Sequence, residues 1–386
     1  MSEYLLLTGA TGLLGRYLMR DLLLADVPLA VLVRKNRKQS AEQRIDGVLA
    51  TWEKRFGQPL SRPVVLEGDI TQPSLGLDVD DLKWIDTHVD SVLNNAASLS
   101  FESGDRNAEP WLSNVDALET MLKVCEQTSV CDFHHVSTSY ICGLRQGRVF
   151  ENDLNVGQEF GNDYERSKIQ AEQMVRESTL FDEKTFYRPA IIIGDSKTGF
   201  TTTFHGFYAV LRLAHTLLRS EVGQQIEGED NSKAPPIRLN LCGDETKNLV
   251  PVDWVSEVMA HILCHRELHG STYHLTPANR VTARDLNDTI ESCCGRSNTT
   301  FSGKGELENP TFIEKLFYEN METYETYWRD DPEFDSSNTL KAVPHLPCPE
   351  VTPELLRYLG EKATEMNFRF NDEPATPQPV PEGSSI

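Results

Sequence analysis

The sequence lacks any apolar run near the roughly 20 residues that a membrane-spanning helix needs. Its N-terminus also lacks the charged, apolar and small-residue segments of a signal peptide, and its 386 residues contain no internal repeat. These absences exclude a bilayer-spanning protein and a solenoid. We therefore expect a cytoplasmic globular protein.

The chain has fewer basic residues than acidic ones. The chain has 37 Lys and Arg against 59 Asp and Glu, a formal net charge of -22. Nucleic acids and anionic membranes attract proteins through positive charge, so neither is an expected partner. The 39% hydrophobic and 8% aromatic content is typical of a folded domain with a large core.

Cysteine pairs with recognisable spacing are also missing. The eight cysteines form no Cys-x-x-Cys motif and no Cys/His run at zinc spacing. In a cytoplasmic chain such cysteines are reduced core residues rather than bridges or ligands. The sequence predicts no metal site.

Six short apolar runs alternate with longer segments of helical period as far as Arg188. This alternation predicts an α/β fold of the Rossmann type, with a doubly wound parallel sheet. The expected strands are Tyr4–Leu7, Leu29–Val33, Pro63–Glu67, Val89–Asn94, Asp132–Ser137 and Lys184–Arg188, and the expected helices cover about 13–25, 38–56, 109–127 and 163–179.

The regular alternation ends near residue 190. We therefore expect the sheet domain at 1–190, with about 240–265 returning to it, and a smaller, mostly helical substrate lobe at 191–370. Residues 371–386 are rich in Pro, Gly, Ser and acid, which predicts a disordered tail. The aromatic segment of the lobe, with Phe317, Tyr318, Tyr324, Tyr327 and Trp328, either lines an apolar substrate pocket or is core, and the pattern favours core.

The first strand runs into the glycine-rich stretch "TGATGLLG", where Gly9, Gly12 and Gly15 flank Thr11 and Leu13. Glycines in a turn between a strand and a helix let the main chain approach a pyrophosphate. The helix N-terminus adds N–H donors and partial positive charge. The stretch predicts a dinucleotide site.

The end of the second strand distinguishes the two nicotinamide cofactors. NAD-binding folds place an acid there for the ribose 2'-OH, whereas a base suits a 2'-phosphate. This chain has Arg34, followed by three further basic residues, and no acid before Glu42. Arg34 is the leading phosphate contact and Arg44 a second, because guanidinium groups bind phosphate bidentately. We predict NADPH as the cofactor.

Two further loops follow predicted strands on the same edge. Asp69 and Ile70, after the third strand, suit a wall beside the adenine. Asn95, Ala96 and Ala97, after the fourth, offer small residues where the chain would pass close to the cofactor.

Two segments have Tyr-x-x-x-Lys spacing, which places a phenol and an ammonium on one helix face. Tyr164 and Lys168 open a helix on the cofactor side of the sheet, and Thr138 ends the preceding strand. Tyr358 and Lys362 fall in a late helix with no nucleotide loop beside it. The first segment is therefore the predicted catalytic site and the second a structural helix.

Carbonyl reduction needs these residue types, because the carbonyl oxygen gains negative charge and then a proton. Tyr164 would supply the proton, and Lys168 would lower its pKa and bind the nicotinamide ribose. Thr138 would hold the carbonyl. Asn114 would organise a water near Lys168, or only cap a helix.

With these motifs assembled, the chain resembles the extended short-chain dehydrogenase/reductases, in particular their thioester reductase and fatty acyl reductase branch. The likeness rests on "TGATGLLG", "VLVR", "NNAAS", "HVSTSYICG", "YERSKIQAE" and "YRPAIIIGDSKTG", and covers about residues 3–265. It implies Thr138, Tyr164 and Lys168 as the catalytic set and Pro189 beside the nicotinamide. It also implies Gly194–Gly199 and Phe200–Tyr208 as the substrate entrance.

The expected reaction is NADPH-dependent reduction of an acyl thioester to an aldehyde, and in a second cycle to an alcohol. The substrate would be a small molecule or a carrier-linked acyl group, with the carrier supplied by another protein. A ketone or secondary-alcohol oxidoreductase is the alternative, followed by an epimerase or dehydratase and by a nucleotide sensor without turnover. A homodimer is the prior expectation from symmetry statistics.

Overall fold

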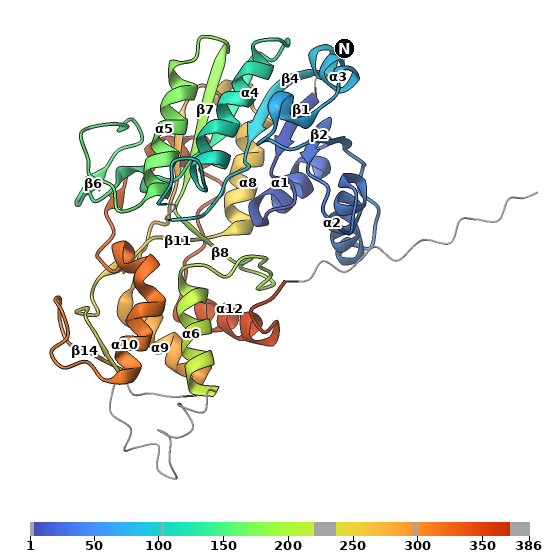
Figure 1. Cartoon of the computed structure of the whole chain (residues 1–386). Helices are drawn as coiled ribbons and strands as arrows, with labels where there is room; N and C mark the ends of the chain where they lie inside the picture. The colour runs from blue at the N-terminus through green and yellow to red at the C-terminus, as the bar shows by residue number, and fades with distance from the viewer. Residues whose placement is uncertain (1–3, 102–103, 220–236, 296–298, 371–386) are drawn as a thin grey trace, which may run out of the picture.

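A computed structural model describes residues 4–101, 104–219, 237–295 and 299–370. The predicted tail at 371–386 lies outside these residues. The main feature is a parallel seven-stranded sheet in the order β12-β7-β5-β4-β1-β2-β3 (Figure 1). Its strands are β1 (Tyr4–Thr8), β2 (Leu29–Val33), β3 (Val64–Glu67), β4 (Val89–Asn94), β5 (Asp132–Val136), β7 (Glu183–Pro189) and β12 (Thr272–Leu275).

Alternate strand residues point to opposite faces of the sheet, and both faces are apolar. Leu5 and Leu7 of β1 belong to one buried cluster, and Leu6 belongs to another. In β2, Val31 and Leu32 are divided in the same way. Strands buried on both faces need continuous apolar runs, which is why these segments could be recognised from sequence.

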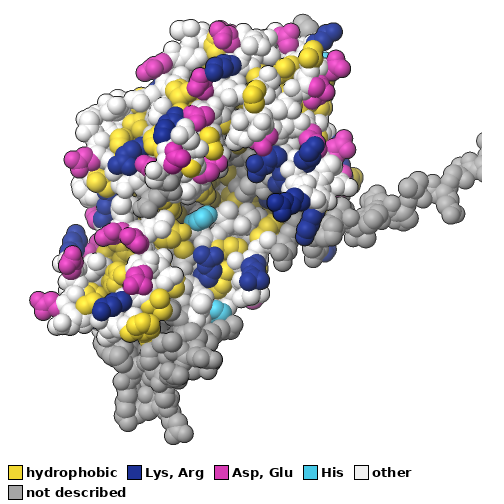
Figure 2. Space-filling view, viewed as in Figure 1, with side chains coloured by type: hydrophobic (Ala, Val, Ile, Leu, Met, Phe, Trp, Pro, Cys, Tyr) yellow, Lys and Arg dark blue, Asp and Glu magenta, His cyan; other side chains and the backbone are white. Residues whose placement is uncertain are grey.

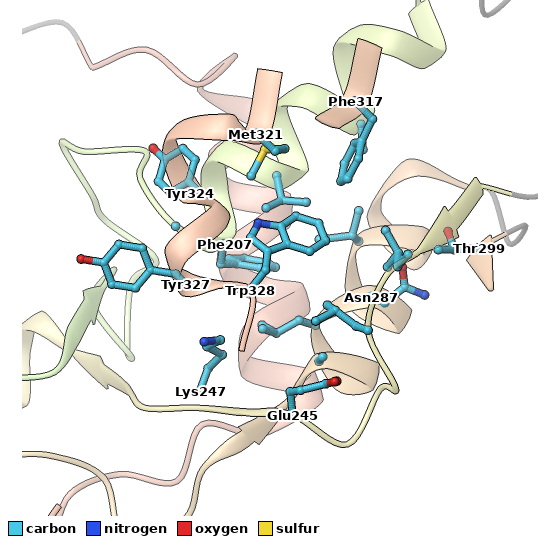
Figure 3. A pocket seen from close by; sticks show the side chains of 18 of the residues that line it. Phe207, Glu245, Lys247, Asn287, Thr299, Phe317, Met321, Tyr324, Tyr327 and Trp328 are labelled. Carbon is cyan, nitrogen blue, oxygen red and sulfur yellow. The ribbon is translucent and has the colours of Figure 1, made fainter. Parts of the chain in front are cut away.

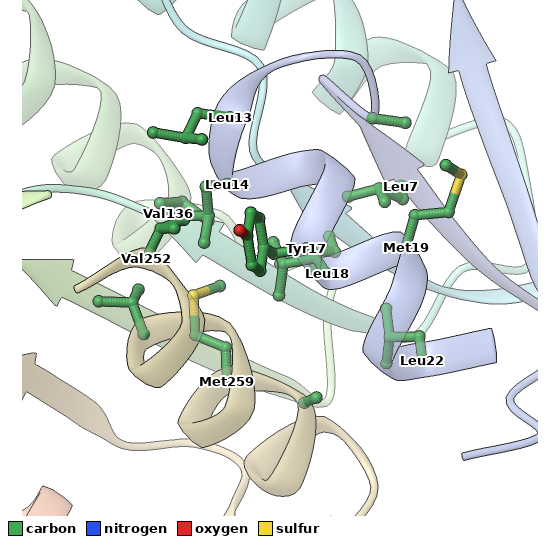
Figure 4. Close-up of a cluster of buried hydrophobic side chains, with 14 of the residues drawn as sticks. Leu7, Leu13, Leu14, Tyr17, Leu18, Met19, Leu22, Val136, Val252 and Met259 are labelled. Atoms are coloured by element: carbon green, nitrogen blue, oxygen red, sulfur yellow. The ribbon is translucent and has the colours of Figure 1, made fainter. Parts of the chain in front are cut away.

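Helices cover both faces. The first cluster packs α1 (Leu13–Leu24), α2 (Ala41–Phe56) and α8 (Val252–Leu263) on the sheet, and Figure 4 shows Tyr17 and Leu18 of α1 near Met259 of α8. The opposite face carries α3 (Val79–His88), α4 (Ala117–Cys125) and α5 (Asp163–Glu177). The α4 helix continues a π-helical turn, Leu112–Asp116. The predicted Rossmann-type fold is confirmed.

Two elements of this domain were missed by the sequence prediction. The α3 helix buries only Ile85 fully, so its apolar stripe is weak. Strand β12 was placed in the substrate lobe, which is wrong, because it pairs with β7 in the main sheet. The return of the chain to the sheet domain therefore extends beyond residue 265. The buried polar residues Thr272 and His274 hide this strand from a search for apolar runs.

The smaller lobe lies beyond one edge of the sheet (Figure 1). Its helices α6 and α12 both pack against α9. The helices of the lobe and its connections are α6 (Phe207–Arg219), α9 (Ala283–Cys294), α10 (Phe312–Met321), α11 (Ser337–Ala342) and α12 (Pro353–Glu365). The short strands form four pairs: β8 (Ile191–Ile193) with β11 (Leu249–Pro251), β9 (Ile237–Leu239) with β14 (Thr299–Phe301), β10 (Thr246–Lys247) with β13 (Val281–Thr282), and β6 (Arg148–Val149) with β15 (Glu333–Phe334).

In the part of the chain that the structure describes, no helix combines the length and apolar character needed to cross a bilayer.

Candidate active site

A cavity of about 600 Å³ lies where the sheet strands end, between the sheet domain and the smaller lobe. Ligands of open α/β sheets bind at this edge, beyond the carboxyl ends of the strands. The volume is within the usual range of small-molecule sites. The cavity is lined by all but one of the sequence-predicted site residues: Gly9, Thr11, Gly12, Leu13, Gly15, Arg34, Arg44, Asp69, Ile70, Asn95, Ala96, Ala97, Thr138, Tyr164, Lys168 and Pro189.

Two of the three glycines in the loop, Gly9 and Gly15, have no room for a side chain. A Cβ on Gly15 would lie 2.0 Å from the carbonyl oxygen of Gly9, and one on Gly9 would lie 2.9 Å from the backbone of Ala96. Gly9 also has a φ of +71°, which favours glycine. Gly12 caps α1 without any side-chain hydrogen bond, so the first N–H groups of the helix face the cavity without a side-chain cap. The loop fits a dinucleotide pyrophosphate.

Two arginines, Arg34 and Arg44, lie next to the glycine loop. Arg44 donates from Nη2 to Thr11 Oγ1 at 3.0 Å and from Nη1 to the carbonyl of Arg34. The Arg34 side chain is exposed and lies 3.4 Å from Asp69 Oδ2. Figure 2 shows Lys and Arg side chains gathered on this face, on the side where α2 lies. A surface with such a group of Lys and Arg side chains can bind a phosphate group through charge-assisted hydrogen bonds.

Thr138, Tyr164 and Lys168 meet beside this cavity. Thr138 follows β5, and its Oγ1 is 3.4 Å from the carbonyl oxygen of Pro189. Tyr164 lies in the first turn of α5, which Asn162 caps by accepting a hydrogen bond from the backbone N–H of Glu165. One turn later, Lys168 Nζ donates to the carbonyl of Val136 at 2.7 Å. The fold therefore brings a hydroxyl, a phenol and an amine to one wall of the cavity.

The expected lowering of the Tyr164 pKa by Lys168 is wrong for this structure. Burial raises the pKa of the phenol, and a hydrogen bond with Thr138 opposes this only in part. Burial also lowers the pKa of Lys168 to about 8, with Glu172 acting in the opposite direction. Tyr164 therefore keeps its proton at neutral pH, which is the form that can donate it.

The buried ammonium of Lys168 predicts an effect on stability. A pKa lowered from 10.5 to about 8 corresponds to a cost on the order of 3 kcal/mol for the charged form in the folded protein. This cost is fully present below pH 8 and is relieved as the pH rises toward 10.5, because the unfolded chain binds more protons in that window. We expect Lys168→Met to raise the free energy of unfolding at pH 7 by up to ~3 kcal/mol, less the lost bond to Val136.

Urea unfolding of both proteins at pH 7 and at pH 10 measures this difference. The stability gain of Lys168→Met should shrink at the higher pH. A variant that is less stable than the wild type at pH 7 would contradict the proposed cost of burying the Lys168 ammonium.

Asn114 lies outside the cavity lining. It is buried in the π-helical turn, where its Oδ1 accepts from the N–H of Ser98 at 2.8 Å and its Nδ2 donates to Ser167 Oγ at 2.9 Å. The amide thus joins the loop after β4 to α5. Its role in organising a water near Lys168 stays a prediction.

The second Tyr-x-x-x-Lys segment lies on α12. Lys362 Nζ pairs with Glu365 Oε2 at 2.7 Å, and neither Tyr358 nor Lys362 lines the described cavity. This placement supports the distinction drawn from sequence.

The predicted substrate entrance is divided by the structure. Thr203, His205 and Tyr208 of the Phe200–Tyr208 segment line the cavity, whereas Gly194–Gly199 does not. That loop is instead fixed to α1, because Tyr17 donates to Asp195 Oδ2 at 2.7 Å.

Several aromatic residues of the cavity were not identified as site residues from sequence. Phe101 comes from the loop after β4 and Tyr140 from the 3₁₀ helix Ser139–Cys142 after β5, both in the sheet domain. Tyr324 and Tyr327 come from the smaller lobe. For these two tyrosines the preference for core over pocket is therefore wrong. Their helical spacing in an aromatic-rich segment was the available signal.

The prediction that the cysteines are core residues needs a correction. All eight cysteines are free, but only Cys125 and Cys142 are buried, Cys242 and Cys264 are exposed, and the other four are intermediate. Cys242, Asp244 and Glu245 bring possible ligand atoms within 4.8 Å of one another. Both oxygens of Glu245 already accept backbone hydrogen bonds from the turn at Cys242, so this cluster is explained by the local fold.

A family model described as male sterility protein, an NAD-binding domain, matches residues 7–259. Curated relatives include one of the linear gramicidin synthase proteins of Brevibacillus parabrevis, 27% identical over 74% of this chain and 5% of its own length. The aldehyde reductase lnaA from Aspergillus flavus is 26% identical over 88% of this chain and 34% of its own length. The fatty acyl-CoA reductase wat from Drosophila melanogaster is 23% identical over 61% of this chain and 52% of its own.

The chain thus covers between 5% and 34% of the length of the first four curated relatives. Among solved structures, the terminal R domain from the myxalamid PKS-NRPS biosynthetic pathway has a TM-score of 0.75 at 23% identity, covering 95% of this chain and 92% of that one. A thiolation-reductase di-domain from an archaeal non-ribosomal peptide synthetase has a TM-score of 0.69 at 19% identity, covering 95% and 76%. These similarities concern the fold.

Proposed function

The chain belongs to the male sterility protein family of extended short-chain dehydrogenase/reductases, and on that premise we propose that it reduces an acyl thioester with NADPH. The supporting observation is the position of Thr138, Tyr164 and Lys168 on the wall of the cavity that the glycine loop also lines. Relatives named as an aldehyde reductase and a fatty acyl-CoA reductase fit this chemistry.

The reduced nicotinamide would supply the hydride that adds to the thioester carbonyl carbon. The glycine loop and the N-terminus of α1 would hold the pyrophosphate, and Arg34 and Arg44 the 2'-phosphate. Thr138 would donate a hydrogen bond to the carbonyl oxygen and orient it toward Tyr164. These residues act by placement and by stabilising charge as it develops.

Tyr164 would give its phenolic proton to the oxygen of the tetrahedral adduct. Collapse of that adduct breaks the carbon–sulfur bond, the hydroxyl proton passes to the leaving sulfur, and a thiol and an aldehyde are released, so that one hydride and one proton are consumed in total. The hydrogen bond from Thr138, which lowers the pKa of the phenol, would stabilise the phenolate that remains until solvent restores its proton, and Lys168 would bind the nicotinamide ribose. A second hydride and proton would convert the aldehyde to an alcohol in the same site.

Cofactor oxidation against a small substrate panel tests this proposal. The panel contains acyl-CoA thioesters, N-acetylcysteamine thioesters, the matching aldehydes and cyclic ketones. We expect NADPH oxidation with the thioesters and the aldehydes. Oxidation with ketones alone would instead identify a secondary-alcohol oxidoreductase, and activity with aldehydes but never with thioesters would overturn the thioester step.

Arg34→Ala tests the choice of cofactor. A charged hydrogen-bonding group is worth about 1.5–3 kcal/mol, so we expect the KM for NADPH to rise by roughly 10- to 100-fold. The KM for NADH should change little, because it has no 2'-phosphate.

Lys35→Ala is the matched control, because this neighbouring base pairs with Glu67 at 3.0 Å and does not line the cavity. Equal effects of Arg34→Ala on both cofactors would contradict a phosphate contact.

A further inference from the structure

A second, smaller cavity of about 210 Å³ lies within the lobe beyond the sheet. We call it the side chamber. Figure 3 shows Trp328 projecting among its lining residues, with Tyr324 and Tyr327 on one side and Asn287 and Thr299 on the other. Helix α6 contributes Phe207, Val210 and Ala214, and the facing walls include Leu239, Leu286, Ile290, Phe317 and Met321.

Hydrogen bonds within the protein engage the charged lining residues Glu245, Lys247, Glu291 and Arg329. Glu291 Oε1 accepts from the N–H of Thr299 at 2.7 Å, and Arg329 Nη2 donates to the carbonyl of Gly143 at 2.9 Å. Lys247 Nζ donates to Asp331 Oδ1 at 2.8 Å and to the carbonyl of Arg329. Glu245 accepts backbone hydrogen bonds at both oxygens. These hydrogen bonds hold the charged groups within the protein, and most of the remaining wall is apolar. An apolar group would therefore bind there with a favourable loss of exposed surface.

The side chamber adjoins the cavity that holds the catalytic residues. Ile191, Gly206, Tyr324 and Tyr327 line both spaces. The Tyr327 ring lies 5.3 Å from that of Phe101, which in turn lies 5.9 Å from the ring of Tyr164, measured between centroids. The ring of Phe101 therefore lies between Tyr164 and Tyr327, the residue that lines both spaces.

We propose that the side chamber binds the distal part of the acyl group when that group is an uncharged chain or ring of roughly six to ten carbons in total. This inference rests on the proposed thioester reduction, with the carbonyl held at Thr138 and Tyr164. The size follows from volume: an apolar cavity of about 150 Å³ holds a benzene molecule, and the side chamber is somewhat larger. Longer chains would extend beyond it, and short ones would leave it empty of ligand atoms.

Ala214→Phe tests the chamber directly, because residue 214 lines it from α6 and a ring there would fill it. Thr216→Phe adds the same ring to the same helix at an exposed position outside the chamber. Isothermal titration with butanoyl, octanoyl and tetradecanoyl N-acetylcysteamine thioesters, in the presence of NADP⁺, measures binding without turnover.

The wild type should gain up to about fourfold in affinity per methylene between the butanoyl and octanoyl compounds, and little beyond. Thr216→Phe should keep this preference, and Ala214→Phe should reduce the octanoyl preference to below about threefold with butanoyl binding unchanged. A folded Ala214→Phe variant that retains the octanoyl preference would overturn the chamber assignment, as would a wild type that binds all three compounds equally. Chain-length-dependent binding without any reduction would instead count against the proposed function alone.

Discussion

Tyr164→Phe is expected to lower kcat for thioester and aldehyde reduction by about 10²- to 10⁴-fold, the usual contribution of a positioned general acid. Phenylalanine keeps the ring that packs edge-on against Phe101 but has no proton to give. The substitution removes only the hydroxyl and its hydrogen bond with Thr138. Because the ring stays in place, we expect the rest of the fold to be unchanged. Cofactor affinity, measured by fluorescence titration of NADPH, should remain near the wild-type value.

Tyr358→Phe provides the matched control, because it removes the hydroxyl from the other Tyr-x-x-x-Lys segment. That tyrosine lies on α12 beside the Gly199 loop and does not line the cavity that contains Tyr164. The control should retain full activity. If Tyr164→Phe also left turnover intact, the proton-donor role would fail. Unchanged cellular function together with unchanged cofactor binding, in a protein without measurable turnover, would instead favour a nucleotide sensor.

Arg188→Leu is expected to destabilise the protein by about 3–5 kcal/mol, the usual result of removing one partner of a buried ion pair. Arg188 and Glu172 are almost fully buried, with Nη2 and Oε1 2.6 Å apart and a second bond from Nε to Oε2 at 3.1 Å. Burial alone would raise the pKa of Glu172, but Arg188, with a smaller contribution from Arg176, lowers it to about 2. The substitution leaves a buried carboxylate without its main partner.

This ion pair joins β7 to α5, the helix that carries Tyr164 and Lys168. Arg176→Leu is the graded control, because its side chain is 31% exposed and pairs with the same Glu172 oxygen. Chemical denaturation at pH 7 should give a much smaller loss for this variant than for Arg188→Leu. Equal losses would show that burial of the pair is not the source of the stability.

The same pair sets a pH dependence. Because the pKa of Glu172 in the folded protein is below its ordinary value of 4.5, its contribution is fully present above that value. The contribution is lost as the pH falls toward 2. The difference in unfolding free energy between the wild type and Arg188→Leu, measured by urea unfolding, should therefore narrow as the pH falls from 4.5 toward 2.

The sequence by itself determined the sheet domain and the dinucleotide loop, because both depend on short-range rules. Strands buried on two faces need continuous apolar runs, and a turn as tight as that at Gly9 and Gly15 needs glycine. The same rules placed Thr138 at a strand end and Tyr164 and Lys168 on one helix face. The exceptions were local as well: α3 has a weak apolar stripe, and β12 contains buried polar residues.

Only the tertiary structure decided what surrounds those residues. The side chamber is formed where residues near 207–214, 283–290 and 317–328 meet, and no local pattern records a space between segments so far apart in the chain. The pKa of Tyr164 follows in the same way from its burial, since desolvation depends on every element packed around a group and not on its neighbour four residues away. Periodicity is a property of a segment, whereas cavities and desolvation are properties of the packed whole.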